Sequence, residues 1–246
     1  MNKKYKISVI TVTKNSKKFL EKNILSLKKQ SYKNYEHIII DGESTDGTQK
    51  IIKKYNKDIK YWVSEPDKGI YDAMNKGIKK SKGDIVAILN SDDFYYKNAL
   101  KIVNGYFNEF KHIDFLFGSV LKHKLMHGYH PKKIKWTFGF YTTHSVGFFI
   151  KRKSQMKVGL YNTKYKFSSD YDLFYRMIVK KKLYGMATKR NELIGRFRPG
   201  GLSHRLKYKD FLRENFQIRL DNGQNKYFLY IIFFFRILRN FRLFLK

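Results

Sequence analysis

Two adjacent carboxylates, Asp92 and Asp93, follow a short apolar run within the segment GDIVAILNSDDFY, residues 83–95. The apolar residues Ile85–Leu89 stop at Asn90, which is the pattern of a buried strand in a parallel sheet. Neighbouring acids repel each other unless a cation or hydrogen-bond donors offset their charge. We therefore predict a divalent metal that holds a substrate diphosphate. A polar turn in which Asp92 or Asp93 caps a following helix is the alternative.

Polar residues also follow two other predicted strands. The apolar run Lys6–Val12 ends at the polar stretch 13–16, and Tyr35–Ile40 ends at the segment DGESTDGT, residues 41–48. Because the carboxyl ends of parallel strands share one edge of a sheet, we expect three polar clusters to face one crevice. Convergent polar groups in a crevice indicate a binding site.

The elements that must position these residues alternate along the chain. Strand–helix alternation with short connections over residues 1–110 predicts an α/β fold with a mostly parallel, doubly wound sheet flanked by helices. Apolar periodicity predicts further strands at 59–63, 115–122 and 144–151, a helical stripe after Phe19, helices at 49–55, 71–80, 97–110 and 167–181, and a Pro-Gly-Gly loop at 196–205.

The amino-acid composition limits the kinds of chemistry and partner that the protein can have. The 246 residues include no cysteine, which excludes disulfides and cysteine nucleophiles and fits a reducing compartment. The formal net charge of +32 favours acidic partners, although a general preference for surface lysine is the alternative explanation for much of it. Walker A, G-x-G-x-x-G and nucleophile-elbow motifs are absent, and residues 41–52 depart from the EF-hand pattern. We expect no export signal before the first strand.

The segment YFLYIIFFFRILRNFRLFLK, residues 227–246, differs from the rest of the chain. Its unbroken apolar run, 227–235, is far shorter than the roughly 20 residues of a spanning helix. Arg236, Arg239 and Arg242 then interrupt apolar residues at helical spacing. This composition favours a helix that lies in a membrane interface. Packing of the helix on the rest of the protein is the alternative.

Five segments together resemble the family 2 glycosyltransferases, most closely those of bacterial envelope and exopolysaccharide synthesis. They are SVITVTKN (8–15), DGESTDGT (41–48), SEPDKGIYDAMNKG (64–77), LNSDD (89–93) and SSDYDLFYR (168–176). The resemblance covers about residues 5–205 and implies a GT-A fold and an inverting transfer from a nucleotide-diphosphate sugar. The processive Q-x-x-R-W signature is absent, which favours transfer of a single sugar.

The resemblance implies roles for individual residues at the donor site. Asn90-Ser91-Asp92 occupies the D-x-D position, with Asp92 as the principal ligand of Mn²⁺ or Mg²⁺, Asp93 beside it and His204 as a further candidate ligand. Asn90 replaces the first aspartate of that motif, so the site has one negative charge fewer. The other expected donor-binding residues are Thr11, Thr13 and Asn15 around the nucleotide, Asp41 at the base, and Asp67 and Lys68 beside the base and ribose.

Asp170 lies where the family places its catalytic base, and Asp172 is the second candidate. A carboxylate in that role takes the proton of the acceptor hydroxyl as its oxygen attacks the sugar, while a metal stabilises charge on the leaving diphosphate. From the residues alone, acids at the start of a helix are also explained by capping. Further candidates near the acceptor or leaving group are His144, Arg196, Arg198, Trp136 and Tyr141.

We therefore predict a metal-dependent, hexosyltransferase-type enzyme that moves one sugar from a UDP-sugar, with a GDP-sugar less favoured. The acceptor would be lipid-linked or a saccharide in cell-surface polysaccharide synthesis. The transferase domain would span 1–205, divided into a nucleotide-sugar half (1–110) and an acceptor half (111–205). Residues 206–246 would form a helical, membrane-associating segment.

The expected location is the cytoplasmic face of the cell membrane, as a peripheral protein. The alternatives are a nucleic-acid-binding protein, prompted by the charge, and a metal-dependent nucleotidyltransferase. Basic nucleic-acid footprints do not require acids at three strand ends, so we expect no nucleic-acid partner.

Overall fold

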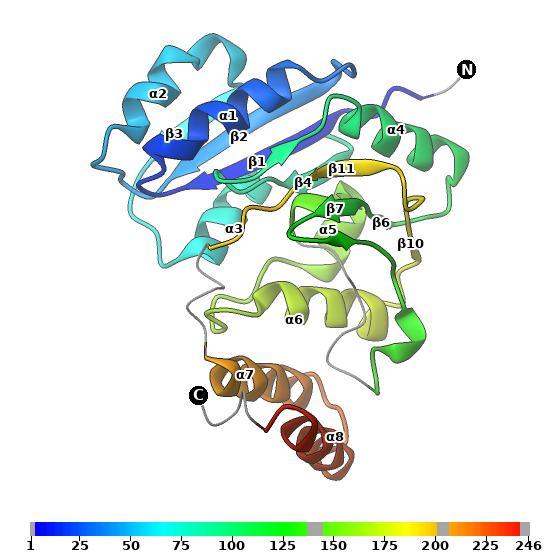
Figure 1. Ribbon diagram of the computed structural model, residues 1–246. Helices are drawn as coiled ribbons and strands as arrows, with labels where there is room; N and C mark the ends of the chain where they lie inside the picture. Colours follow the sequence, from blue (N-terminus) through cyan, green and yellow to red (C-terminus); the bar gives the residue numbers. More distant parts are fainter. Residues whose placement is uncertain (1–2, 137–144, 201–206, 242–246) are drawn as a thin grey trace.

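The computed structural model describes residues 3–136, 145–200 and 207–241. A seven-stranded sheet forms the centre of the molecule, in the order β10-β6-β9-β4-β1-β2-β3 (Figure 1). Neighbouring strands are parallel except for β9, which runs antiparallel to both β4 and β6. The strands are β1 (Ile7–Thr13), β2 (Tyr35–Asp41), β3 (Tyr61–Ser64), β4 (Ile85–Ile88), β6 (Phe115–Phe117), β9 (Phe148–Lys151) and β10 (Gly185–Ala187).

Helices cover both faces of this sheet, as the alternating sequence predicts (Figure 1). One face packs against α1 (Lys17–Lys28), α2 (Thr48–Lys54) and α4 (Ala99–Glu109). The other packs against α3 (Ile70–Lys80), α5 (Arg152–Val158) and α6 (Ser169–Tyr175). Successive residues of β1 alternate between the two layers, since Ile10 and Val12 face α3 whereas Val9 packs in the layer of α4. The predicted doubly wound α/β fold is confirmed.

The chain leaves the central sheet at Gly118, where the predicted strand Phe115–Lys122 divides in two. Residues after Gly118 enter a four-stranded sheet of order β5-β11-β7-β8. A side chain at Gly118 would collide with Ile194, so glycine permits the close crossing of the two sheets. The strands are β5 (Phe94–Tyr95), β7 (Ser119–Leu121), β8 (Leu125–Met126) and β11 (Leu193–Arg196). The prediction of one continuous strand was therefore wrong, and Arg196 ends a strand instead of opening a loop.

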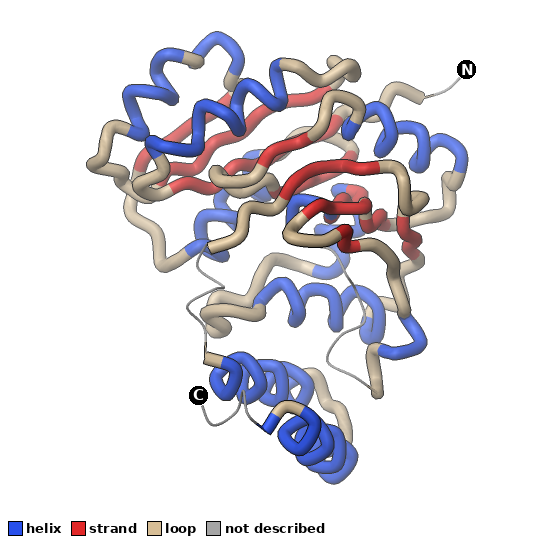
Figure 2. The backbone as a smooth tube through the Cα atoms, in the orientation of Figure 1, coloured by secondary structure: helices blue, strands red, loops and turns tan. Residues whose placement is uncertain are grey.

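The C-terminal helices lie beneath α6, away from the sheet (Figure 2). After α6 the chain continues as a π-helix, Arg176–Lys180, followed later by α7 (Tyr208–Asp221) and α8 (Lys226–Arg239). Arg219 of α7 is fully buried and anchors this layer, because its guanidinium donates to the Tyr171 hydroxyl and to the Ile134 carbonyl. Among the described helices, none has the length and apolar composition needed to cross a bilayer.

Candidate active site

The turns after β1 and β2 are bonded to each other at the carboxyl edge of the sheet. The backbone N–H of Asn15 donates to Ser44 Oγ over 2.7 Å, and the side-chain oxygen Asn15 Oδ1 accepts from the Thr45 N–H over 2.9 Å. Asn15 has a φ of 50°, a left-handed conformation that asparagine tolerates better than most residues. The Asn15 side chain therefore joins the turn after β1 to the turn after β2, at the edge where the sequence predicts a crevice.

Asp41 is fully buried at the end of β2, where it organises the next turn. Its carboxylate accepts hydrogen bonds from the Ser44 N–H over 3.0 Å, from the Ser44 hydroxyl, and from the Ser64 hydroxyl over 2.6 Å. Gly42 follows directly, and a side chain there would collide with the carboxylate of Asp67. The structure thus brings Asp41 and Asp67 to the same edge, with the oxygens of Asp41 already bonded to serines.

Asp67 and Lys68 lie in the connection between β3 and α3. The Asp67 carboxylate accepts from the Gly69 N–H over 2.9 Å, and the Lys68 N–H donates to Asp72 Oδ2 over 3.1 Å. These bonds shape the start of α3 and leave the ammonium group of Lys68 outside every ion pair found among the described residues. The two predicted donor residues therefore sit on the same edge as the first two turns.

The turn Asn90–Asp93 after β4 is held from below by Asn23 of α1. Asn23 Nδ2 donates to the Asn90 carbonyl over 2.9 Å and to the Asp93 carbonyl over 3.0 Å. Ser91 adds a bond from its hydroxyl to Ser16 Oγ, which links this turn to the end of β1. Three turns that are distant in sequence thus form one hydrogen-bonded rim.

Thr11 belongs to the support of this rim and not to its surface. Its side chain is fully buried between Asn23 and His37, at 3.2 Å from Asn23 Oδ1 and 2.9 Å from His37 Nε2. Burial lowers the pKa of His37 to about 3, so this imidazole is neutral. The Thr11 hydroxyl has one proton, which it donates to Asn23 Oδ1, so it must accept a hydrogen bond from His37 Nε2. This arrangement orients the side-chain amide of Asn23 toward the turn. The role of Thr11 beside the nucleotide stays a prediction, and its observed contacts are those of a support below the turn.

Asp92 and Asp93 differ sharply although they are adjacent. Asp92 is partly exposed, whereas Asp93 is 1% exposed and one of its oxygens, Oδ2, lacks a hydrogen-bond partner among the described residues. Burial raises the pKa of the Asp93 carboxyl well above its usual value, and the charge of Asp92 raises it further. Asp92 is therefore the more accessible of the two carboxylates. We therefore place Asp92 first among the predicted metal ligands, and the role of Asp93 stays a prediction.

Arg198 brings a positive charge to the same turn. Its guanidinium lies 3.7 Å from Asp92 Oδ2 and 3.8 Å from the ring centre of Phe19, and its backbone N–H donates to Asp93 Oδ1 over 2.9 Å. Burial raises the pKa of Asp92, while the nearby guanidinium opposes that shift. The chain thus places a cation beside the acid that occupies the expected metal position.

Asp170 and Asp172 also have different environments. Asp172 is 2% exposed; its carboxylate forms an ion pair with Arg176 over 2.8 Å and accepts from Asn222 over 2.9 Å. Asp170 is partly exposed at the first turn of α6. Its charge contributes to the raised pKa values of Tyr71 and Tyr161, whose main cause is burial. Of the two predicted bases, Asp170 is therefore the more accessible, because the carboxylate of Asp172 is enclosed and paired.

The donor set fits a divalent cation held in part by its substrate. Among the described residues, no three His, Asp or Glu side chains gather into a protein-only metal cluster. Mg²⁺ typically binds through one or two carboxylates together with substrate phosphates. Asp92 supplies one partly exposed carboxylate, and Asn90 places a buried amide oxygen, Oδ1, that has no partner in the described structure. Such a site is compatible with a metal that arrives with a diphosphate.

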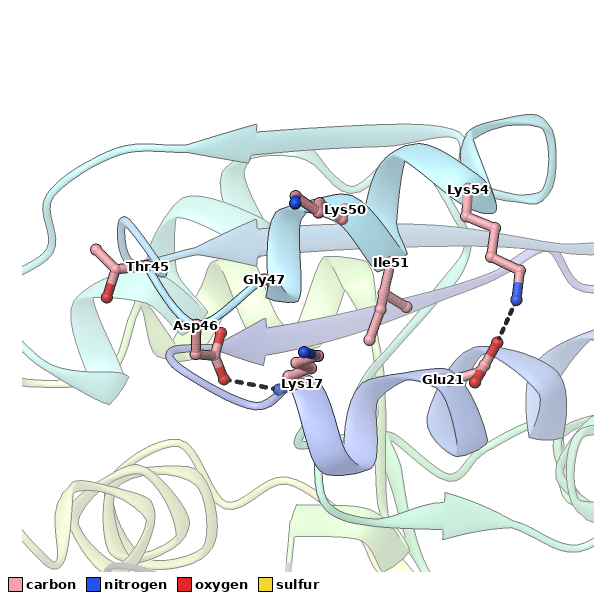
Figure 3. Close-up of a pocket in the computed structure, with 8 residues that line it drawn as sticks. All are labelled: Lys17, Glu21, Thr45, Asp46, Gly47, Lys50, Ile51 and Lys54. Atoms are coloured by element: carbon pink, nitrogen blue, oxygen red, sulfur yellow. Dashed lines mark hydrogen bonds and ion pairs between the residues drawn. The ribbon is translucent and has the colours of Figure 1, made fainter.

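A cavity of about 570 Å³ lies beside the rim, on the outer side of the β2 turn (Figure 3). Lysines 17, 50 and 54 border it, with Asp46 bonded to the Lys17 N–H over 3.0 Å and Lys54 paired with Glu21 over 2.8 Å. None of the residues predicted to bind donor or metal lines this cavity.

Some candidates fall elsewhere. His144, Tyr141 and His204 lie outside the described residues. Trp136 is exposed and packs edge-on against Phe228 of α8, with ring centres 5.1 Å apart.

Asn23 and His37 are functional supports that we did not predict from the sequence. Asn23 occupies the buried stripe of α1 together with Leu20, Ile24 and Leu27. A single amide on an apolar helical face is a detectable signal, because a buried polar group requires partners. His37 gives a similar signal inside the apolar strand β2.

A doubly wound sheet with amides and acids gathered at the carboxyl edge of its central strands is the architecture of GT-A glycosyltransferases. The chain superposes on S. aureus TarS 1-349 in complex with UDP-GlcNAc with a TM-score of 0.69 and 18% identity, covering 93% of this chain and 70% of that one. A mannosyltransferase from Pyrobaculum calidifontis, in complex with GDP-Man and Mn²⁺, gives a TM-score of 0.67 and 16% identity over 93% and 68% of the two chains. At these identities the likeness shows the fold.

The chain belongs to glycosyl transferase family 2, whose family model matches residues 8–166. An uncharacterized glycosyltransferase of Mycobacterium tuberculosis is 41% identical over 35% of this chain and 34% of its own length. The putative teichuronic acid biosynthesis glycosyltransferase TuaG of Bacillus subtilis is 37% identical over 39% of each chain. A PGL/p-HBAD biosynthesis glycosyltransferase of Mycobacterium bovis is 25% identical over 84% and 82% of the two chains. The first two matches thus span little more than a third of those relatives.

Proposed function

We propose that this family 2 enzyme transfers one sugar, with inversion, from a UDP-sugar to a lipid-linked or saccharide acceptor in cell-surface polysaccharide synthesis. The observation that carries the proposal is the partly exposed Asp92 on a rim formed by three strand ends. The relatives named for teichuronic acid and PGL/p-HBAD biosynthesis support a product in the cell envelope. The UDP-GlcNAc complex of TarS supports UDP as the nucleotide.

Donor binding in this proposal uses the residues of the rim. Thr13 and Asn15 border the nucleotide, Lys68 and Asp67 border its base and ribose side, and Asp41 reaches the base through Ser44 and Ser64. Thr13 Oγ1 is buried without a hydrogen-bond partner in the described structure, and such groups are uncommon unless a ligand or water completes them. The diphosphate then lies beside Asp92 and Arg198.

Asp92 is the residue that would hold Mn²⁺ or Mg²⁺, with Asn90 and Ser91 beside it. When bound, the ion supplies Lewis-acid stabilisation of the charge that develops on the leaving diphosphate. The guanidinium of Arg198, 3.7 Å from Asp92, supplies positive charge from the protein side. The segment Asn90-Ser91-Asp92 contains a single carboxylate. The dependence of donor binding and turnover on the metal should therefore be measured for this enzyme.

Asp170 is the proposed base. It is partly exposed, close to Tyr71 and Tyr161, and lies at the first turn of α6, where the helix dipole favours the ionised carboxylate. In this role the Asp170 carboxylate accepts the proton of the acceptor hydroxyl while that oxygen attacks the anomeric carbon. Direct attack by the acceptor requires no covalent intermediate and inverts the anomeric configuration.

The proposed location is the cytoplasmic face of the membrane, in peripheral contact. Net charge of +32 attracts an anionic surface, and the exposed apolar residues of α8 provide a face for contact. The same location gives access to lipid-linked acceptors.

Calorimetric titration with UDP, in the presence and absence of Mn²⁺, tests the donor site. In the presence of Mn²⁺ we expect saturable binding that Asp92→Asn weakens at least tenfold, because the carboxylate that would hold the ion beside the diphosphate is lost. Asp58→Asn is the matched control, since Asp58 is an acid paired with Lys28 before the amino end of β3. Equal UDP binding by wild type and Asp92→Asn, or metal-independent DNA binding in place of UDP binding, would contradict the proposal.

A further inference from the structure

α8 presents an exposed apolar stripe at helical spacing. Tyr227, Tyr230, Ile231, Phe234, Phe235 and Leu238 are each more than half exposed. Their spacing of three and four residues places them along one side of the helix. Monomeric proteins rarely leave so much contiguous apolar surface in water.

The opposite side of α8 is already occupied. Leu229 is fully buried, and Phe233 packs on Phe216 of α7 with ring centres 5.2 Å apart. The helix is therefore packed on α7 by one side and exposes apolar residues on the other. It lies at the end of the molecule away from the sheet (Figure 1), so the exposed stripe does not cover the rim of the active site.

A second cavity opens beside the start of this stripe. It has a volume of about 380 Å³ and is bordered by Lys135, Trp136, Tyr175, Lys180 and Phe228. Trp136 is 66% exposed and packs edge-on against Phe228. Indole rings are enriched where one side of a protein meets apolar lipid and the other meets water.

The cavity has a positive electrostatic character. Lys135 and Lys180 are both exposed, and neither takes part in an ion pair found among the described residues. The adjoining acids, Asp172 and Asp221, are already paired with Arg176 and Lys164. Residues 222–246 contain no acidic residue. Phosphate is therefore the kind of group that suits these two ammonium groups.

We propose that the cavity between Lys135 and Lys180 binds the phosphate of an anionic phospholipid while the α8 stripe enters the bilayer interface. The inference rests on the proposed membrane contact and gives it a specific ligand site. The two lysines suit lipid phosphate, the indole of Trp136 suits the interface, and the apolar stripe suits the upper part of the acyl chains. The site orients the enzyme toward a lipid-linked acceptor.

Co-sedimentation of the full chain with vesicles tests this site. Wild type is expected to bind vesicles of equal phosphatidylcholine and phosphatidylglycerol more tightly than vesicles of phosphatidylcholine alone. The double variant Lys135→Gln/Lys180→Gln should bind the anionic vesicles roughly 30-fold more weakly, since each lysine near an anionic surface contributes about fivefold. Its residual binding to phosphatidylcholine should match wild type.

Two further variants make the result specific. Phe234→Ser/Phe235→Ser should lose binding to both kinds of vesicle. The matched control Lys53→Gln/Lys101→Gln removes two exposed lysines from α2 and α4, on the opposite face of the sheet (Figure 1), and should bind like wild type. UDP titration of each variant should give the wild-type affinity, so failure of lipid binding is distinguishable from failure of the donor site.

Three outcomes would overturn the inference. If the control variant Lys53→Gln/Lys101→Gln lost as much vesicle affinity, vesicle binding would be due to the overall positive charge and not to this cavity. Competition by inorganic phosphate that fully releases the protein would assign the cavity to a free anion. A wild-type dimer in sedimentation velocity that becomes monomeric in Phe234→Ser/Phe235→Ser, with vesicle binding retained, would assign the stripe to contact between two copies.

Discussion

The turn after β4 and the first turn of α6 each contain two neighbouring acids, and in each pair one is partly exposed while the other is buried. The buried acids differ in how the protein accommodates them. Asp172 has a counter-ion in Arg176, whereas Asp93 receives only a backbone N–H from Arg198 and keeps one oxygen without a partner in the described structure. The comparison shows that a buried carboxyl group near the site can be accommodated in two ways. It can be ionised beside a counter-ion, or it can favour the protonated form where no counter-ion is present.

The largest effect should come from removing the charge of Asp172. Asp172→Asn leaves the largely buried guanidinium of Arg176 without its counter-ion, and breaking such a pair costs about 3 kcal/mol of unfolding free energy. Urea denaturation followed by circular dichroism measures the loss. Asp170→Asn, on the same helical turn but outside that pair, is the matched control and should change stability by less than about 1 kcal/mol. Full stability in Asp172→Asn, combined with lost turnover, would reverse the assignments of the two acids.

The exposed member of the same pair should show the opposite behaviour. Asp170→Asn should bind UDP normally but lower turnover by roughly 100-fold or more, because an amide cannot accept the acceptor proton. That factor corresponds to about 2.7 kcal/mol of transition-state stabilisation. Single-turnover measurement of sugar transfer checks it. A near-normal rate in this variant would remove Asp170 from the chemistry.

The two acid pairs also show what the sequence can predict about such a site. Alternating apolar runs predicted the doubly wound sheet, and polar residues after β1, β2 and β4 predicted one shared edge, since both follow from local periodicity. The division between exposed and buried acids depends on Arg176, Asn222 and Arg198. Arg198 is 105 residues from Asp93 and Asn222 is 50 from Asp172, so no local pattern reports these contacts. The strand division at Gly118 escaped prediction for the same reason, because Ile194 lies far along the chain.

The support below the β4 turn gives an intermediate effect. Asn23→Ala removes both donors to the Asn90 and Asp93 carbonyls, and leaving such buried acceptors unpaired costs about 2 kcal/mol. Because the turn carries Asp92, the UDP affinity measured with Mn²⁺ should fall together with stability. Thr11→Val should cost less, since it removes only the hydroxyl that orients the amide. Asn34→Ala, which removes an exposed bond to the Lys4 carbonyl, is the control; an equal loss of UDP affinity there would show that the effect is not specific to the turn.

The last effect concerns Asp93, and its sign should be opposite to that of Asp172. Because the pKa of Asp93 is raised in the folded protein, the folded state keeps a proton that the unfolded chain releases above about pH 4. The unfolding free energy contributed by this group therefore falls as the pH rises from about 4 through the folded pKa.

Asp93→Asn abolishes this titration while retaining an acceptor for the Arg198 N–H. The variant should match wild type near pH 4 and exceed it at neutral pH, because the amide has no proton to release as the pH rises. Urea midpoints measured from pH 4 to pH 8 check both the sign and the slope. A stability difference that is independent of pH, or a loss of stability at neutral pH, would mean that Asp93 is held as a charge, like Asp172. UDP affinity should stay near the wild-type value, in contrast to Asp92→Asn, because the Asp93 side chain is only 1% exposed.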